Sequence, residues 1–321
     1  MRKHRYLFGN LLVYGGGNPS TSICRWLCHS ADEVGCGLKH KFLLLAAGFL
    51  VAAFLSAGEQ KTLPTPARRI VSLAPHLVEL LYAVGAGDYL VGVVDHGDYP
   101  PEARRLPSVG GAGRVDLERI LALRCDLVVA WGSGTPMTQI EQLRRLGLTV
   151  YVSEPRTLAD IALELERLGR LVGKEDTATA AAANFRARLA ELQTRYANQP
   201  PVTVFYQVWD HPLVSVGAGH LISRVMELCG GRNILDADRG LAPIINREAV
   251  LAANPDVIIA SGADAHRPAW LDDWRAWPRL AAVAYDNLFD IPPDLIQRHT
   301  PRLLRGAELL CADLEIARNK R

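Results

Sequence analysis

Short apolar runs rich in β-branched residues alternate along this chain with segments in which apolar residues recur every three or four positions. Runs of the first kind are predicted strands and segments of the second kind are predicted helices. The strands are expected at residues 70–73, 90–94, 127–130, 148–152, 202–208, 257–260 and 287–291. Strands that alternate with helices are typical of parallel sheets, so we predict an α/β fold.

A different pattern separates the first four predicted strands from the last three. Thr157 and Asp160 have the spacing of a capping box that opens one helix. An Ala-rich segment at residues 176–198 then carries apolar residues at helical spacing, namely Phe185, Leu189, Leu192 and Tyr196. A helix of about 20 residues is about 30 Å long, enough to cross from one lobe to another. We therefore expect two lobes joined by a single long backbone helix.

An internal repeat supports two related lobes. Residues 115–134 align without gaps on residues 245–264, with identities that include Glu118/Glu248 and Asp126/Asp256. Each copy is predicted to form a helix with a polar cap, a strand led by Asp and a glycine turn. The expected parts are an N-terminal lobe at 68–155, linking helices at 156–199 and a C-terminal lobe at 200–321.

The first 57 residues have the pattern of an export signal. Lys39 and Lys41 precede a 14-residue apolar run at residues 42–55, which small residues follow. A membrane-spanning helix needs about 20 apolar residues, so the run fits a secretory signal better. We therefore expect residues 1–57 to be a leader with a signal peptide, and the rest to be exported to the periplasm.

Charge and motifs exclude several classes of function. The leader holds six Lys or Arg and two Asp or Glu, which leaves the remainder with 30 basic and 32 acidic residues. Such a balance gives no electrostatic reason to expect nucleic-acid binding. The sequence contains no nucleophile elbow, phosphate-binding loop or dinucleotide fingerprint. Its histidines form no paired metal motif, so most of them are expected to be scattered surface residues, although two or three could converge in space.

Several segments resemble one family, the periplasmic cobalamin-binding proteins. The resemblance covers about residues 68–317, and its motifs lie at residues 70–75, 98–101, 116–120, 255–258 and 300–302. The family belongs to a wider class that binds corrinoids, haem and ferric siderophores. It implies two Rossmann-like lobes bridged by one helix, with the ligand in the cleft between them.

The resemblance also implies a function in transport. Such a protein is not an enzyme and has neither a resident cofactor nor a metal site of its own. It binds cobalamin, a corrinoid, and delivers it to an ABC importer made of a membrane permease and an ATPase. We expect a monomer whose partners are that ligand and that importer.

The family's functional positions can be placed on this sequence. The expected ligand-binding residues are His96, Trp131, Trp209, Asp294 and Arg298. The acids expected to dock onto the permease are Glu118 and Glu248, which the repeat also pairs. The alternative ligand within the class is haem or a ferric siderophore, for which His96 could bind the metal.

Three cysteines follow the leader: Cys125, Cys229 and Cys311. An oxidising compartment permits one disulfide among the three and leaves one thiol. The resemblance implies that Cys229 and Cys311 are joined, with Cys125 left as a buried thiol at the start of a strand.

Overall fold

A computed structural model of the chain describes residues 65–111, 113–235, 240–262 and 266–320. The expected leader, residues 1–57, lies outside the described residues. Within them, no helix is both long enough and apolar enough to cross a membrane.

The first lobe is built on a four-stranded sheet in the order β2-β1-β5-β6, in which all neighbours are parallel. Its strands are β1 (Ile70–Ser72), β2 (Leu90–Val93), β5 (Leu127–Trp131) and β6 (Val150–Ser153). Most of their side chains are buried, which is the usual pattern where helices cover both faces of a sheet. The other elements of this lobe are α1 (Pro75–Ala83), η1 (Gly87–Tyr89), η2 (Pro101–Arg105), β3 (Gly110–Gly111), β4 (Arg114–Val115), α2 (Leu117–Ala122) and α3 (Met137–Arg145).

The second lobe repeats the arrangement with variations. Its sheet runs β11-β10-β7-β8, and β9 also pairs with β7; only the β7–β8 pair is antiparallel. The strands are β7 (Val202–Trp209), β8 (Val214–Ser215), β9 (Gly231–Asn233), β10 (Val257–Ala260) and β11 (Leu288–Asp290). The helices are α6 (Leu221–Leu228), α7 (Arg247–Ala253), η4 (Ala269–Ala276), α8 (Ala281–Ala284), α9 (Pro293–Ile296) and α10 (Leu303–Asn319).

The internal repeat has a structural basis. Asp116 and Asn246 cap α2 and α7 in the same way, each accepting a hydrogen bond from the backbone N–H three residues later. Asp126 accepts from the backbone N–H of Arg68, and Asp256 accepts from that of Thr203, both at 2.8 Å. In each lobe the repeated Asp therefore joins its own strand to the start of the neighbouring strand by a hydrogen bond.

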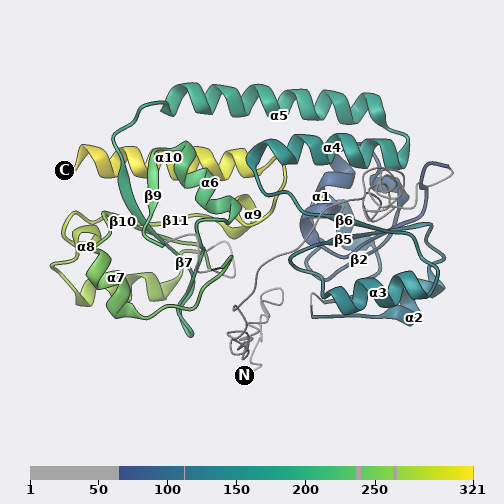
Figure 1. Ribbon diagram of the computed structural model, residues 1–321, viewed down its shortest axis with the longest axis horizontal. Coiled ribbons are helices and arrows are strands. Elements are labelled where there is room, and N and C mark those ends of the chain that lie inside the picture. Colours follow the sequence, from purple (N-terminus) through teal and green to yellow (C-terminus); the bar gives the residue numbers. More distant parts are fainter. Residues whose placement is uncertain (1–64, 112, 236–239, 263–265, 321) are drawn as a thin grey trace, which may run out of the picture. The chain divides into compact units, whose positions relative to one another are not determined.

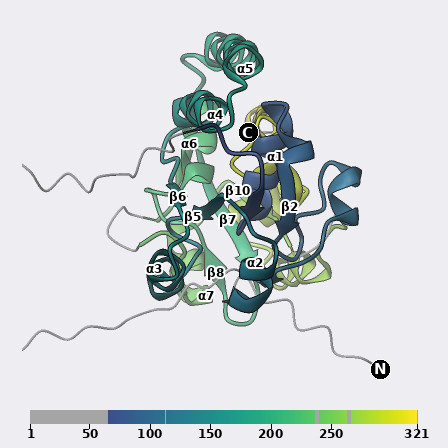
Figure 2. The same cartoon turned by 90° about the vertical axis from the view of Figure 1, so that its right-hand side faces the viewer.

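Two helices connect the sheets. The capping box of Thr157 and Asp160 begins α4 (Leu158–Val172), and Gly173, at φ 62°, ends it in the left-handed conformation that glycine adopts without strain. The long helix is α5 (Glu175–Tyr196), which packs against α4 along one part of its length and against α6 and α10 along the other (Figure 1). Seen nearly end-on, α5 lies farther from the strands than α4 and α6 do (Figure 2). The predicted backbone helix is thus confirmed.

One continuous apolar cluster links the two lobes. It includes Leu77 of α1, Phe185 and Leu189 of α5, Val204 of β7 and Leu310 of α10, all buried. A shared core of this kind holds both lobes against α5, so it favours a stiff arrangement over a freely hinged one.

A disulfide joins Cys229, at the end of α6, to Cys311 in α10, with the Cα atoms 4.8 Å apart. Cys125 is a buried free thiol, and burial raises its pKa. The predicted pairing is confirmed.

Replacing Cys229 and Cys311 by alanine is expected to lower the free energy of unfolding. The bond closes a loop of 82 residues, for which chain-entropy models give about 4 kcal/mol. Urea denaturation of the double variant measures the loss, and Cys125→Ala is the control that leaves the bond intact. An unchanged unfolding midpoint in the double variant would contradict the prediction.

Candidate functional site

Four rings from the two lobes meet in one cluster, formed by His76, Trp131, His220 and His299 and called here the ring cluster. The His76 ring lies 5.2 Å from that of Trp131 and 5.4 Å from that of His299, measured between ring centroids. His299 in turn lies 5.6 Å from Trp131 and 6.2 Å from His220. Residues up to 223 positions apart in the sequence are therefore in contact.

The topology explains why these residues meet. Trp131 is the last residue of β5, and His76 lies in the first turn of α1, just beyond the end of β1. His299 follows β11 and α9 in the second lobe, and His220 is the N-cap of α6. In open α/β sheets, the space beyond the carboxyl ends of the strands is where ligands bind.

Three polar atoms of the ring cluster are buried without a hydrogen-bond partner: Nε2 of His76, Nδ1 of His299 and Nε1 of Trp131. The His76 side chain is enclosed, since the residue is only 4% exposed. Buried polar groups are nearly always hydrogen-bonded, and an unpaired one costs about 1–3 kcal/mol. Unpaired polar atoms gathered at one place are typical of a site that holds a polar group or a water molecule.

The three imidazoles are neutral at pH 7. Burial, reinforced by the positive charge of Arg298, lowers the pKa of His76 to about 3, and burial lowers that of His220 to about 4. The pKa of His299 is held well below its ordinary value by burial and by the neighbouring His76 and His220. Because Nδ1 of His220 accepts from the backbone N–H of Ile222, its proton is assigned to Nε2. The ring cluster therefore presents hydrogen-bonding groups without net charge.

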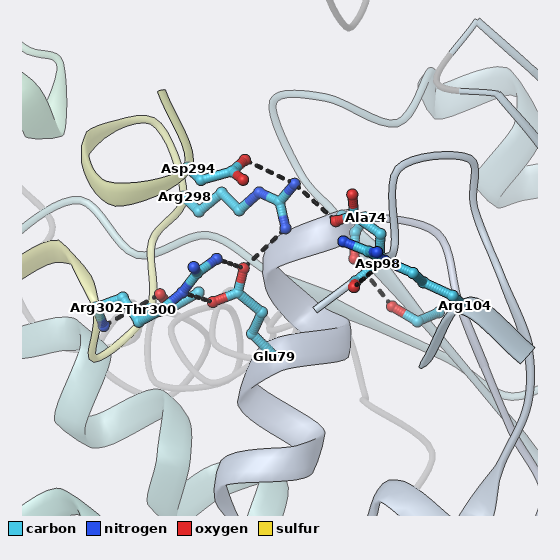
Figure 3. Close-up of polar contacts among 9 residues, drawn as sticks. Ala74, Glu79, Asp98, Arg104, Asp294, Arg298, Thr300 and Arg302 are labelled. Atoms are coloured by element: carbon cyan, nitrogen blue, oxygen red, sulfur yellow. Dashed lines mark hydrogen bonds and ion pairs between the residues drawn. The ribbon is translucent and has the colours of Figure 1, made fainter. Parts of the chain in front are cut away.

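A second cluster of side chains joins the lobes by ion pairs (Figure 3). It adjoins the ring cluster, because Arg298 directly precedes His299 in the chain. This ion-pair cluster consists of Glu79, Asp98, Asp294, Arg298 and Arg302. Glu79 of α1 accepts hydrogen bonds from Arg298, at 2.9 Å, and from Arg302, at 2.6 and 2.9 Å. Arg298 also contacts Asp98 at 3.0 Å and Asp294 at 2.8 Å. One buried carboxylate of the first lobe is thus held by two guanidinium groups of the second.

Of the predicted ligand-binding residues, three fall in these two clusters. Trp131 belongs to the ring cluster, and Asp294 and Arg298 pair with each other in the ion-pair cluster. Trp209 is the half-buried last residue of β7 and donates from Nε1 to the backbone carbonyl of His211. His96 is exposed in the loop after β2, at φ 64°, two residues before Asp98. Trp209 thus lies at the carboxyl end of β7, and His96 lies three residues past the carboxyl end of β2.

The residues that the sequence did not single out are His76, Glu79, His220, His299 and Arg302. The expectation that most histidines are scattered on the surface is wrong for His76 and His299, which are 4% and 6% exposed. One signal was present, because Glu79 interrupts an apolar helical run and lies at a buried position. A buried carboxylate requires a cationic partner or several donors, so its partner could have been sought among the arginines.

Glu118 and Glu248 occupy equivalent positions in the two lobes. Each is exposed and lies in the first turn of its helix, α2 or α7. Both helices lie on the side of the lobes away from α5 in the two views (Figures 1 and 2). An acid in a first turn also stabilises its helix, which gives each Glu a local role that is independent of any partner.

The convergence of three histidines does not create a metal centre. Among the residues that the structure describes, no group of three or more His, Cys, Asp and Glu side chains has the arrangement needed to hold a metal ion.

Comparison with known proteins places the chain among binding proteins. The family model described as "Periplasmic binding protein" matches residues 70–295. The vitamin B12-binding protein of Vibrio cholerae serotype O1 is 40% identical over 258 residues, which cover 80% of this chain and 92% of that protein. The vitamin B12-binding protein of Photorhabdus laumondii is 35% identical over 267 residues, covering 83% and 94%.

Solved structures give the same result. The crystal structure of the periplasmic vitamin B12-binding protein of Vibrio cholerae matches with a TM-score of 0.74 at 39% identity, covering 79% of this chain and 99% of that one. A periplasmic haem-binding protein from Pseudomonas aeruginosa matches with a TM-score of 0.67 at 26% identity, covering 77% and 92%. These matches confirm the two-lobed α/β fold, and this chain belongs to the periplasmic binding protein family.

Proposed function

We propose that this protein binds a corrinoid, cobalamin, between its two lobes and delivers it to an ABC importer. The observation that carries the proposal is the ring cluster, in which both lobes contribute aromatic and uncharged polar groups beyond the ends of their strands. The identity of about 40% with vitamin B12-binding proteins supports the same ligand. The corrin ring offers apolar faces to Trp131, which is half-buried at the end of β5.

The site suits capture and release without chemistry. The shared core and the ion pairs between the lobes preorganise the binding surfaces, so little conformational entropy is lost when a ligand is bound. The function is therefore that of an exported solute-binding protein, with the permease and ATPase of the importer as partners and no resident cofactor.

Titration of the purified protein with cyanocobalamin and haemin, side by side, tests the ligand. We expect saturable 1:1 binding of cyanocobalamin and quenching of tryptophan fluorescence. Haemin bound tightly with a shifted Soret band, together with no response to cyanocobalamin, would instead support the haem alternative. His96→Ala separates the two further, because it would abolish haem binding if the imidazole were a ligand of the iron and would change corrinoid binding little.

Trp131→Ala is expected to weaken cyanocobalamin binding by about 1–3 kcal/mol, because the apolar contact of the indole with the ligand is lost. The equivalent position in the second lobe is Ser261, so the fold itself does not require an aromatic residue there. Isothermal titration calorimetry measures the change. Trp277→Ala is the control, since that half-buried indole packs on the core of η4 and β10. Unchanged affinity in Trp131→Ala would remove this residue from the binding site.

A further inference from the structure

The ion-pair cluster contains more acids than bases. Three carboxylates, those of Glu79, Asp98 and Asp294, face two guanidinium groups, those of Arg298 and Arg302. The charges of these five side chains therefore sum to −1, although the arginines are the kind of group that would bind an anionic ligand. The exposed Arg104 lies beside them, and its Nε donates to the backbone carbonyl of Asp98 (Figure 3).

Most of the donor nitrogen atoms of the two arginines already contact carboxylate groups of the cluster. Nη1 of Arg298 donates to Glu79, while its Nη2 contacts Asp98 and Asp294. Nε and Nη2 of Arg302 both donate to Glu79, and the Tyr99 ring covers the guanidinium face at 3.6 Å. Glu79 is central, because each of its oxygens accepts and its side chain is only 3% exposed. A ligand carboxylate that drew either arginine away would leave a buried charge without its partner, which is costly.

The neighbouring ring cluster does not supply a positive charge either. His299 follows Arg298 directly in the chain, and burial, reinforced by the positive charge of Arg298, lowers the pKa of His76 and keeps it neutral. The neutral imidazole and indole rings therefore offer no positive charge that would pair with a ligand carboxylate. A carboxylate would instead meet a negatively charged cluster at short range.

We propose that Glu79 is a specificity-determining residue. Together with Asp98 and Asp294 it neutralises Arg298 and Arg302, so that the site accepts amide-bearing uncharged ligands and rejects their carboxylate analogues. This inference rests on the proposed function and deepens it. Glu79 selects ligands by charge through the two arginines, in addition to tying the lobes together.

Cyanocobalamin and its monocarboxylic acids are matched probes, because one ring propionamide is hydrolysed and the shape is nearly unchanged. We expect the wild-type protein to bind the acids at pH 7.5 roughly tenfold more weakly than the amide, as one extra negative charge near the cluster predicts. Glu79→Gln and Asp98→Asn each remove one negative charge from the cluster and should bring the ratio of the two affinities close to one.

Two control variants distinguish an effect of the charge of the cluster from an effect of disturbing the structure. Glu79→Gln combined with Arg302→Gln removes one charge of each sign, so the cluster stays at −1 and the discrimination should persist. Glu227→Gln changes the net charge of the protein equally at an exposed ion pair with Arg224, and should leave the ratio unchanged. Should Glu79→Gln fold poorly, Asp98→Asn carries the test, since the Asp98 side chain is 41% exposed and its removal uncovers no buried charge.

The outcomes distinguish this inference from the proposed function. Equal wild-type affinity for amide and acids, or a ratio that stays unchanged in both Glu79→Gln and Asp98→Asn, overturns the charge selection while leaving cobalamin binding intact. Failure of the wild-type protein to bind cyanocobalamin overturns the proposed function, and the charge selection with it.

Discussion

Reversing both acids, Glu118→Lys with Glu248→Lys, is expected to abolish delivery of cobalamin to the importer while the affinity for cobalamin in solution stays nearly unchanged. The two side chains are exposed, in equivalent first turns of α2 and α7, and α2 and α7 lie on the side away from α5. Two equivalent acids on a pseudo-symmetric molecule match a partner with two-fold symmetry, such as a pair of permease subunits. Four units of charge change at a docking surface convert attraction into repulsion at both points.

Uptake of radiolabelled cobalamin into proteoliposomes or into cells that lack the native binding protein measures delivery, and calorimetry measures affinity. The matched control is Glu175→Lys with Glu191→Lys, which reverses two exposed charges on α5 and should leave uptake intact. Normal uptake by the Glu118/Glu248 variant would contradict the docking role. A large loss of affinity in the same variant would place these residues in the ligand site.

The strands and linking helices could be predicted because each is indicated by a pattern within its own short segment of the sequence. Buried parallel strands are apolar runs, and β10 occupies residues 257–260 as expected. The capping box at Thr157 and Asp160 forms as the spacing indicates. By contrast, β3, β4 and β8 have two residues each, too few to show any periodicity in sequence.

The contacts of the site could be predicted only in part because they are not local. Arg298 and Glu79 are 219 residues apart, and His76 and His299 are 223 apart, so no pattern within one segment reports them. The resemblance to a family named Trp131, Asp294 and Arg298 one by one, but it did not show that Arg298 is already paired with a buried carboxylate. That pairing depends on two elements of different lobes, α1 and the segment after α9.

The histidines show why burial is hard to predict from a sequence. His299 lies between the polar residues Arg298 and Thr300, and His220 follows Gly219, as surface residues commonly do. His76 differs, because it begins an apolar helical run with Leu77 and Val78. The three histidines are enclosed because both lobes bring the ends of their strands to the same place, where each ring packs on the next. Burial of neutral histidines lowers the stability that they contribute when the pH falls.

The contribution of the buried histidines to stability is expected to fall as the pH drops below about 6.5. Asp313 acts in the opposite direction, because burial raises its pKa to about 7 and its folded form therefore gains stability as it takes up a proton. The pKa of His76 is 6.5 when the chain is unfolded and about 3 in the folded state, so between these values only the unfolded chain binds the proton. The contribution of His76 to stability is therefore complete above pH 6.5 and declines as the pH falls toward 3. At pH 4 the loss from His76 alone is about 3 kcal/mol, and His220 and His299, whose pKa values are lowered in the same direction, add to it.

Urea denaturation at pH 7.5, 6, 5 and 4 measures this loss, and His76→Phe isolates the share of His76. The phenylalanine ring keeps an aromatic group against Trp131 but binds no proton, so the free energy of unfolding should fall by about 3 kcal/mol less between pH 7.5 and 4 than in the wild-type protein. His211→Asn is the control, because the side chain of His211 is 83% exposed. Parallel pH profiles for the wild-type protein and His76→Phe would show that His76 takes up its proton in the folded state, and that the ring cluster opens to water without unfolding.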